Sequence, residues 1–257
     1  MPALRPEWPA PPGVRALCSA RDGGVSGAPF DSLNLGDHVG DDPALVAANR
    51  ARHGQALQAR PVYLRQVHAT AVARLTHETP DGTQADACIS IEPGVACTIM
   101  VADCLPILLC DDQGHVVGAA HAGWRGLAGE GGWGVAESTV EAMAQALALG
   151  TAAAGPRLIA WLGPCIGPTA FEVGPDVLAA FTATDAAAVA CFKPLREGKW
   201  LADLAALARR RLRALAVDRI HGNDGSAPWC TVSNRSQFFS FRRDGVTGRF
   251  AASVWRD

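Results

Sequence analysis

The sequence has little net charge, few aromatic residues and no long uninterrupted apolar run. Its formal charge at pH 7 is −2 with the histidines neutral, and aromatic residues make up 6% of the chain. This balance argues against the strongly basic surface of a nucleic-acid or anionic-membrane binder. The longest apolar stretch, residues 95–110, is interrupted by Asp103 and Pro106, so it does not predict a transmembrane helix. We therefore expect a protein that binds neither nucleic acids nor membranes.

Signals of export and of internal duplication are also missing. Residues 1–15 are rich in proline and have no apolar signal core, which favours a cytoplasmic protein. Its eight cysteines are then expected to be reduced thiols, and several of them lie within apolar segments. Because no repeat or linker is visible, we expect a flexible lead over residues 1–13 and a single catalytic domain over residues 14–257. The expected assembly is a monomer or a weak homodimer.

The sequence mixes strand and helix patterns without strict alternation. Hydrophobic residues make up 49% of the chain, enough for a sizeable core. Strands are predicted at 14–20, on both sides of a bend at His68 within 61–75, at 85–91, twice between 95 and 122, at 156–163, and on either side of a polar loop between 229 and 255. Helices are predicted over 43–57, 135–150 and 201–217, with shorter elements near 171–183 and 191–200. This mixture predicts an α+β domain with mixed β-sheets flanked by helices.

One thiol and two imidazoles are the strongest candidates for chemistry. Cys104 and His121 lie at the polar ends of buried strands, and His68 lies at the predicted bend. Three such ligands suit Zn²⁺ with a fourth position left for water or substrate, and bound zinc lowers the pKa of water to about 7. The spacing alone also permits three structural residues. A further alternative is a nucleophilic Cys104 with His68 or His121 as its base.

Polar residues beside these candidates suggest a substrate site. Arg125 precedes a predicted helix and is either an anion clamp or an arginine packed on Trp124. Asn34 either contacts a ligand or makes an Asx turn. Arg242 belongs to a dense polar turn that also contains Arg243, Asp244 and Arg249, which is either an internal salt-bridge cluster or an aid to anion binding.

Two buried-looking carboxylates have equally open roles. Asp103 precedes Cys104, and Asp86 precedes the strand at 87–91. Each is either an orienting partner of a histidine ligand or a structural residue.

The motifs RQVH at 65–68, ADCLPILL at 102–109, HAGWRG at 121–126, GPCIGP at 163–168 and FFSFRRDGVTGR at 238–249 occur in this order. Together with the polar segment at 21–43, they resemble the laccase-domain, YfiH-like family, also called the multicopper polyphenol oxidoreductase or purine nucleoside phosphorylase family. The resemblance covers about residues 14–255. It implies a single α+β domain and a zinc site formed by His68, Cys104 and His121. Ala69 differs from the glycine that often follows QVH in the family.

The resemblance also implies an activity on purine nucleosides. Family chemistry includes phosphorolysis of adenosine, inosine and methylthioadenosine, and deamination of adenosine. Other members are linked to copper-dependent polyphenol oxidation or to editing of peptidoglycan precursors. We therefore expect a zinc enzyme, with copper possible in vitro, that acts on a nucleoside and phosphate. The expected site residues are His68, Cys104, His121 and Arg125 for catalysis, with Asn34, Arg125 and Arg242 for substrate binding; Asp103 and Glu172 are weak candidates for the general acid.

Two readings from other classes remain. A Cys–His hydrolase or amidase would act on a cell-wall precursor without metal. A structural zinc protein would need a fourth ligand, for which Cys165 is the residue to test.

Overall fold

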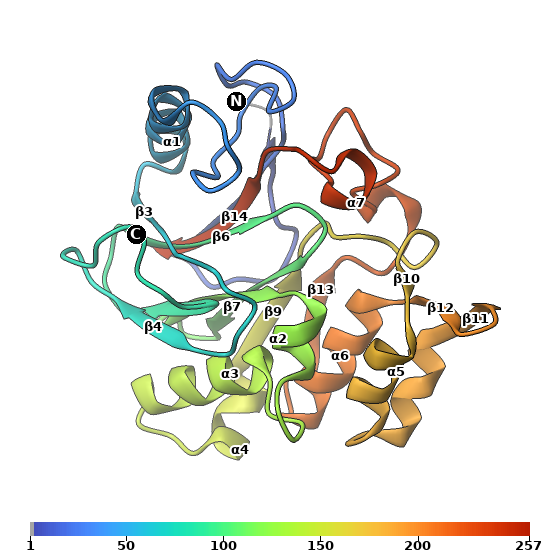
Figure 1. Cartoon of the computed structure of the whole chain (residues 1–257). Helices are drawn as coiled ribbons and strands as arrows, with labels where there is room; N and C mark the ends of the chain where they lie inside the picture. Colours follow the sequence, from blue (N-terminus) through green and yellow to red (C-terminus); the bar gives the residue numbers. More distant parts are fainter. Residues whose placement is uncertain (1–2) are drawn as a thin grey trace.

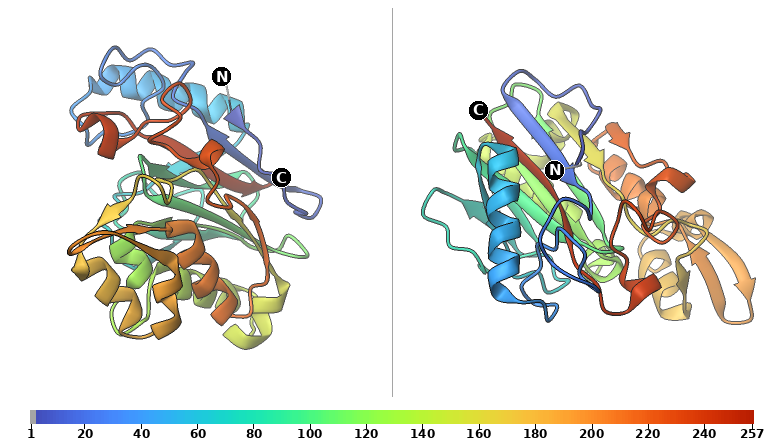
Figure 2. Two further views of the ribbon diagram at one scale, coloured as in Figure 1. Left: turned by 90° about the vertical axis from the view of Figure 1, so that its right-hand side faces the viewer. Right: turned by 90° about the horizontal axis from the view of Figure 1, so that it is seen from above.

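Two β-sheets pack face to face in the computed structural model, which describes residues 3–257 (Figures 1 and 2). The first sheet has the order β1 (Ala3–Leu4), β2 (Val14–Ser19), β14 (Phe250–Arg256), β6 (Val95–Val101), β3 (Arg60–Tyr63). Its neighbouring strands are antiparallel except for the parallel pair β6 and β3. The second sheet has the order β13 (Arg219–Gly222), β9 (Leu158–Leu162), β7 (Leu105–Asp111), β8 (Val117–Ala122), β5 (Ala87–Ser90), β4 (Val72–Leu75). Its outer pairs are parallel and its inner pairs antiparallel.

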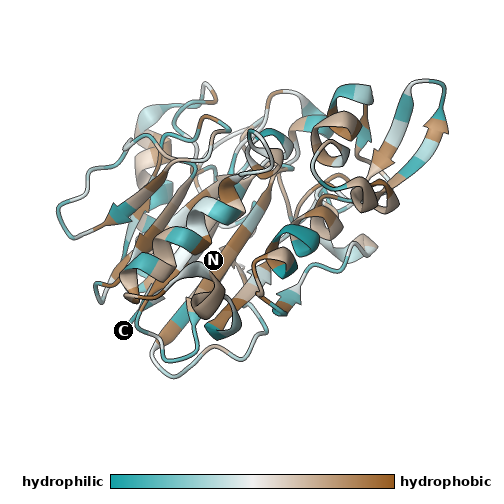
Figure 3. Cartoon of the chain, turned by 90° about the horizontal axis from the view of Figure 1, so that it is seen from below, coloured by the Kyte–Doolittle hydropathy of each residue, from teal (hydrophilic) through white to brown (hydrophobic). Residues whose placement is uncertain are grey.

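Helices cover the outer faces of this sandwich. Helix α1 (Pro43–Leu57) lies over the five-stranded sheet, where Leu57 packs with Leu17, Ala96 and Trp255. On the other side, brown apolar strands lie behind helices with teal outer turns in Figure 3. These are α2 (Trp124–Ala128), α3 (Val135–Ala146), α4 (Thr151–Ala154), α5 (Pro175–Thr182) and α6 (Leu204–Ala214). A small antiparallel sheet of β10 (Glu172–Val173), β12 (Lys199–Ala202) and β11 (Phe192–Arg196) extends this layer.

The hydrophobic pattern explains why both sheets are buried. Strands β6, β7 and β8 have no exposed residue, as their continuous apolar sequences predict. Cys97, Ile99 and Val254 of one sheet pack against Leu108 and Val117 of the other. Among the described residues, no helix combines the length and the apolar character needed to cross a bilayer.

The predicted α+β class with mixed sheets is confirmed, and α1 has the predicted bounds, whereas α6 spans Leu204–Ala214 within the predicted 201–217. Asp42 caps α1 by accepting a hydrogen bond from the Ala44 N–H at 2.8 Å, and Asp203 caps α6 through the Ala206 N–H at 2.8 Å. These caps satisfy N–H groups that have no partner within the helix.

Several element predictions differ from the structure. The segment 95–122 forms three strands instead of two, because the chain turns at Asp103, where φ is 94°. The glycine-rich segment after His121 contains α2, and α3 ends at Ala146 instead of Gly150. Residues 227–229 form the 3-10 turn η3 and not a strand, while Phe241–Asp244 forms the short helix α7 in the predicted polar loop. The remaining 3-10 turns are η1 (Gly155–Arg157) and η2 (Ala186–Cys191).

The predicted lead over residues 1–13 includes β1, where Ala3 and Leu4 pair with Ser19 and Cys18. Its first two residues lie outside the described part of the chain, and flexibility of the lead stays a prediction.

Candidate metal centre and active-site pocket

The three predicted ligands come from three separate parts of the two sheets. His68 lies in the loop between β3 and β4, Cys104 follows the turn between β6 and β7, and His121 lies near the end of β8. Their ligand atoms all lie within 4.8 Å of one another. The Cys104 Sγ is 3.7 Å from the His68 Nε2. A tetrahedral zinc with ordinary bond lengths places its sulfur and nitrogen ligands about 3.5 Å apart, so the donor set fits this metal.

Asp86 organises two of the three ligands. Its fully buried carboxylate accepts the backbone N–H groups of Val67, His68 and Ala69 at 3.1, 2.8 and 2.8 Å. It also lies 2.8 Å from the His121 Nδ1, which leaves Nε2 of that ring for the ligand cluster. His68 has a φ of 63°, a left-handed conformation that these three bonds hold in place. Of the two roles considered for Asp86, the orienting one matches this geometry.

Electrostatics favour a thiolate at Cys104. Burial raises the pKa of this thiol, but the nearby charge of His121 and hydrogen bonds from both imidazoles outweigh it and lower the pKa to about 6. For His121 burial acts in the opposite direction and lowers the pKa, but the Cys104 thiolate and Asp86 outweigh burial and raise the pKa to about 9. The thiolate is the form of cysteine that binds metals or attacks carbonyl groups.

Gly123 lets the cluster form, because a side chain at this position would meet two ligands. A Cβ atom there would lie 2.8 Å from the His68 Cδ2 and 3.0 Å from the Cys104 Sγ. Both separations are shorter than normal contacts, so the backbone next to His121 must carry a glycine.

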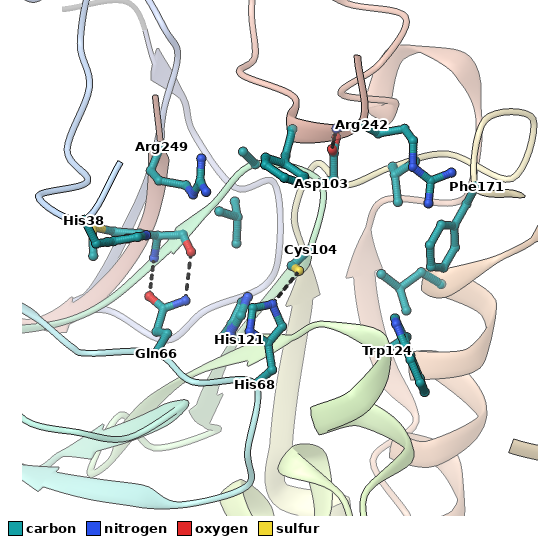
Figure 4. A pocket seen from close by; sticks show the side chains of 16 residues that line it. His38, Gln66, His68, Asp103, Cys104, His121, Trp124, Phe171, Arg242 and Arg249 are labelled. Carbon is teal, nitrogen blue, oxygen red and sulfur yellow. Dashed lines mark hydrogen bonds between the residues drawn. The ribbon is translucent and has the colours of Figure 1, made fainter. Parts of the chain in front are cut away.

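A cavity of about 420 Å³ opens above the cluster (Figure 4). At one end lie the aromatic side chains of Trp124 and Phe171, and the Arg242 guanidinium lies 5.6 Å from the Phe171 ring centre. Phe241 also lines the cavity. At the other end Figure 4 shows His38, Gln66 and Arg249. The remaining lining residues are Met100, Val101, Ala102, Asp103, Ile166 and Leu204. The three ligands lie between an aromatic and a cationic end.

Asp103 is a structural anchor of this cavity. Its carboxylate accepts the Thr231 hydroxyl at 2.6 Å and the backbone N–H of Arg242 at 2.6 Å, and its backbone carbonyl accepts the Ile166 N–H at 2.9 Å. It thereby ties the β6–β7 turn to α7. The structural alternative for Asp103 matches these contacts.

The predicted substrate residues fall into two groups. Arg242 lines the cavity, whereas the lining residues in the described chain do not include Arg125, Asn34 or Glu172. The Arg125 guanidinium is 4.4 Å from the Trp124 ring centre, which is the packing alternative, and Glu172 is paired with Arg196. Their roles at the substrate stay predictions.

Asn34 forms the Asx turn that was its alternative role. Its Oδ1 accepts the Gly36 N–H at 2.9 Å and also the Arg249 N–H at 2.9 Å. The residues of the polar turn near the C-terminus have two different surroundings. Arg243 and Asp244 form the expected internal ion pair at 2.7 Å, while Arg242 and Arg249 face the cavity.

Sequence reasoning missed His38 and Phe171 as cavity residues, and it named Arg249 only as a member of the polar turn that either forms ion pairs or aids anion binding. The one signal in the sequence that pointed to His38 was its position in the polar segment at 21–43. Cys165 is buried and does not belong to the ligand cluster, whose members within the described chain are His68, Cys104 and His121.

Comparison with known proteins shows the family to which the chain belongs. The family described as "multi-copper polyphenol oxidoreductase laccase" matches residues 15–257. The chain belongs to this family. Among its relatives, a purine nucleoside phosphorylase of Pseudomonas aeruginosa is 49% identical, with 98% of this chain and 97% of that protein covered. The purine nucleoside phosphorylase YfiH of Escherichia coli is 48% identical, with 97% of each chain covered.

Solved structures of the family have the same fold. A Neisseria meningitidis protein is similar with a TM-score of 0.87 at 42% identity, covering 99% of each chain. YlmD from Geobacillus stearothermophilus has a TM-score of 0.86 at 29% identity, covering 100% of this chain and 96% of its own. The resemblance inferred from the five motifs is therefore confirmed.

Proposed function

We propose that this protein is a zinc-dependent purine nucleoside phosphorylase that also deaminates adenosine. The names of its relatives support phosphorolysis. The observation that carries the proposal is the His-Cys-His cluster at the middle of a cavity with an aromatic and a cationic end. The aromatic end, the ligand cluster and the cationic end would take the flat base, the sugar and the phosphate anion in that order.

His68, Cys104 and His121 would hold the metal, and Asp86 keeps the His121 ring oriented toward it. When bound, zinc supplies Lewis acidity at the floor of the cavity. Copper also binds thiolates and imidazoles, so copper loading in vitro fits the same donor set. Three ligands are too few for the several copper ions of a multicopper oxidase, so we do not propose polyphenol oxidation as the main activity.

In phosphorolysis, an oxygen of hydrogen phosphate forms a bond to the ribose C1′ while the C1′–N9 bond breaks. The bonding electrons move onto the purine, and the proton that hydrogen phosphate gives up balances the one that the purine takes. Trp124, Phe171 and Phe241 supply aromatic surface for the base, with Arg242 beside it. In deamination, water adds at C6 of adenosine and ammonia leaves, so that inosine forms.

The first experiment measures metal content together with release of hypoxanthine from inosine, with and without phosphate. We expect stoichiometric zinc and phosphate-dependent release in the wild type, and loss of both in Cys104→Ala. A zinc-free wild-type protein with full phosphorolysis would contradict the metal's role. Adenosine, followed by ammonia release without phosphate, tests the second activity in the same samples.

The second candidate is a Cys–His hydrolase that cleaves an amide in a cell-wall precursor. It is favoured by one observation, since Asp86, His121 and Cys104 are arranged as orienting carboxylate, base and thiol, with the thiol pKa lowered to about 6. His68→Ala separates the two candidates. Loss of zinc and of nucleoside cleavage supports the phosphorylase, whereas amide cleavage that survives His68→Ala but not Cys104→Ala supports the hydrolase.

A structural zinc protein would need a fourth protein ligand. Since Cys165 lies outside the ligand cluster, we expect Cys165→Ala to leave the zinc content unchanged. Loss of zinc in this variant would favour the structural alternative.

A further inference from the structure

The end of the cavity away from Phe171 carries an arginine without a carboxylate partner. Arg249 lies directly before β14, and its guanidinium points into the cavity near His38 (Figure 4). In the described chain, no carboxylate oxygen lies within ion-pair distance of it. By contrast, the half-buried Arg50 is paired with Asp37 and Arg211 with Glu137. A partly buried guanidinium that lacks a carboxylate partner and faces a cavity can bind an anion there.

The guanidinium of Arg249 keeps hydrogen-bond donors available. Its Nη1 donates to the carbonyls of Thr247 and Gly248 at 3.1 and 3.0 Å. For Nε and Nη2, the described residues provide no acceptor. These two nitrogens form the fork that binds two oxygens of one oxyanion at the same time.

The other polar groups at this end of the cavity already have partners. The Gln66 amide donates to the Met100 carbonyl at 2.8 Å and accepts the Met100 N–H at 2.9 Å. His38 keeps its ring at the cavity. Burial, followed by the Arg249 charge, lowers its pKa, which favours a neutral ring that can donate one N–H. The Nδ1 of His38 lies 3.5 Å from the Asp37 Oδ1, so the one N–H of a neutral ring already has a carboxylate partner. The free donors at this end of the cavity are thus those of Arg249.

The fold fixes the position of Arg249 from two directions. Asn34 accepts the Arg249 backbone N–H and is itself held by Asp41, to which its Nδ2 donates at 2.9 Å. Gly36 leaves room for the side chain, because a Cβ atom there would lie 2.8 Å from the Arg249 Cγ. The predicted substrate residue Asn34 would therefore act as a positioning residue for the arginine that binds the anion.

We propose that Arg249 forms the subsite for inorganic phosphate beside His38, and that Asn34 and Gly36 position the arginine side chain. The identification of phosphate rests on the proposed phosphorolysis. Arg242 is the competing cation, but its guanidinium is exposed, lies beside the Phe171 ring and donates to the carbonyls of Ala170 and Glu172. With the base at that aromatic end and the sugar above the ligands, the phosphate lies at Arg249.

The test compares Arg249→Met with Arg242→Met and Arg125→Met. Phosphate binding to each metal-loaded protein is titrated by calorimetry, and the fold of each variant is checked by its melting temperature. Loss of a charge-assisted hydrogen-bond pair weakens binding about 10- to 100-fold, so this is the effect expected for Arg249→Met alone. Arg249→Lys should recover part of the affinity. Gly36→Ala, which keeps the charge but displaces the side chain, should also weaken phosphate binding.

Kinetics with inosine give a second readout. For Arg249→Met the KM for phosphate should rise at least tenfold with little change in the KM for inosine, and for Arg242→Met the KM for inosine should rise instead. Unchanged phosphate binding in Arg249→Met, or an equal loss in Arg125→Met, would overturn the assignment. If the wild type binds phosphate through Arg249 but cleaves no nucleoside, the anion subsite stands and the proposed function fails.

Discussion

Replacement of Asp86 by Asn provides the sharpest test of how the ligand cluster is held. The carboxylate is completely buried and makes hydrogen bonds to three backbone N–H groups and to the His121 Nδ1. An amide of the same shape keeps one acceptor oxygen but directs its NH₂ group at N–H donors. One or two charge-assisted bonds are lost, each contributing about 1.5–3 kcal/mol.

Two effects should follow from this substitution. Folding stability should fall by about 2–4 kcal/mol, which lowers the melting temperature by roughly 5–15 °C for a chain of this size. Because loss of an orienting partner typically weakens metal binding about 10- to 100-fold, zinc affinity should fall by that factor. The affinity is measured by competition with a chromophoric chelator, and the stability by thermal unfolding of the zinc-free protein.

Asp103→Asn is the matched control for Asp86→Asn. Asp103 is also a buried carboxylate next to a ligand, but its partners are the Thr231 hydroxyl and the Arg242 N–H instead of an imidazole. It should lower stability while changing zinc affinity less than threefold. If Asp86→Asn binds zinc as tightly as the wild type, or if the two variants lose zinc affinity equally, the orienting role of Asp86 is wrong.

Three further outcomes are expected. Gly123→Ala should abolish zinc binding, since the added methyl group would lie within 3.0 Å of His68 and Cys104; full zinc occupancy in that variant would contradict the packing argument. In the zinc-free protein, stability should fall by about 3 kcal/mol between pH 6.5 and pH 4, because burial lowers the pKa of His53 to about 4 and the unfolded chain takes up the proton first. Urea unfolding at several pH values should show this slope in the wild type and a flatter one in His53→Gln. Arg125→Ala should reduce kcat/KM for inosine less than fivefold, because the exposed Arg125 packs its guanidinium on the Trp124 ring and does not line the cavity. A loss of a hundredfold or more would instead support the anion-clamp role of Arg125.

The sequence by itself determined the elements whose signals are local. Continuous apolar runs predicted buried strands around residues 95–122, and the helix predicted over 43–57 is α1, because its signals lie within the segment itself. One thiol and two imidazoles were also candidates from the sequence, but their spacing left three structural residues open, and the zinc site was implied by the family resemblance. The motifs around them identified the family.

Tertiary structure decided which residues serve these ligands. Asp86 and Asp103 look alike in the sequence, yet only Asp86 reaches an imidazole, because β5 pairs with β8 beside His121 while Asp103 turns toward α7. From the sequence alone, Arg125 and Arg249 could each lie on the surface or in the active-site cavity. Arg125 lies on its neighbouring indole, whereas Arg249 reaches the cavity because Asn34, 215 residues earlier in the chain, holds its backbone. Such long-range contacts depend on which strands pair, and no local pattern encodes that pairing.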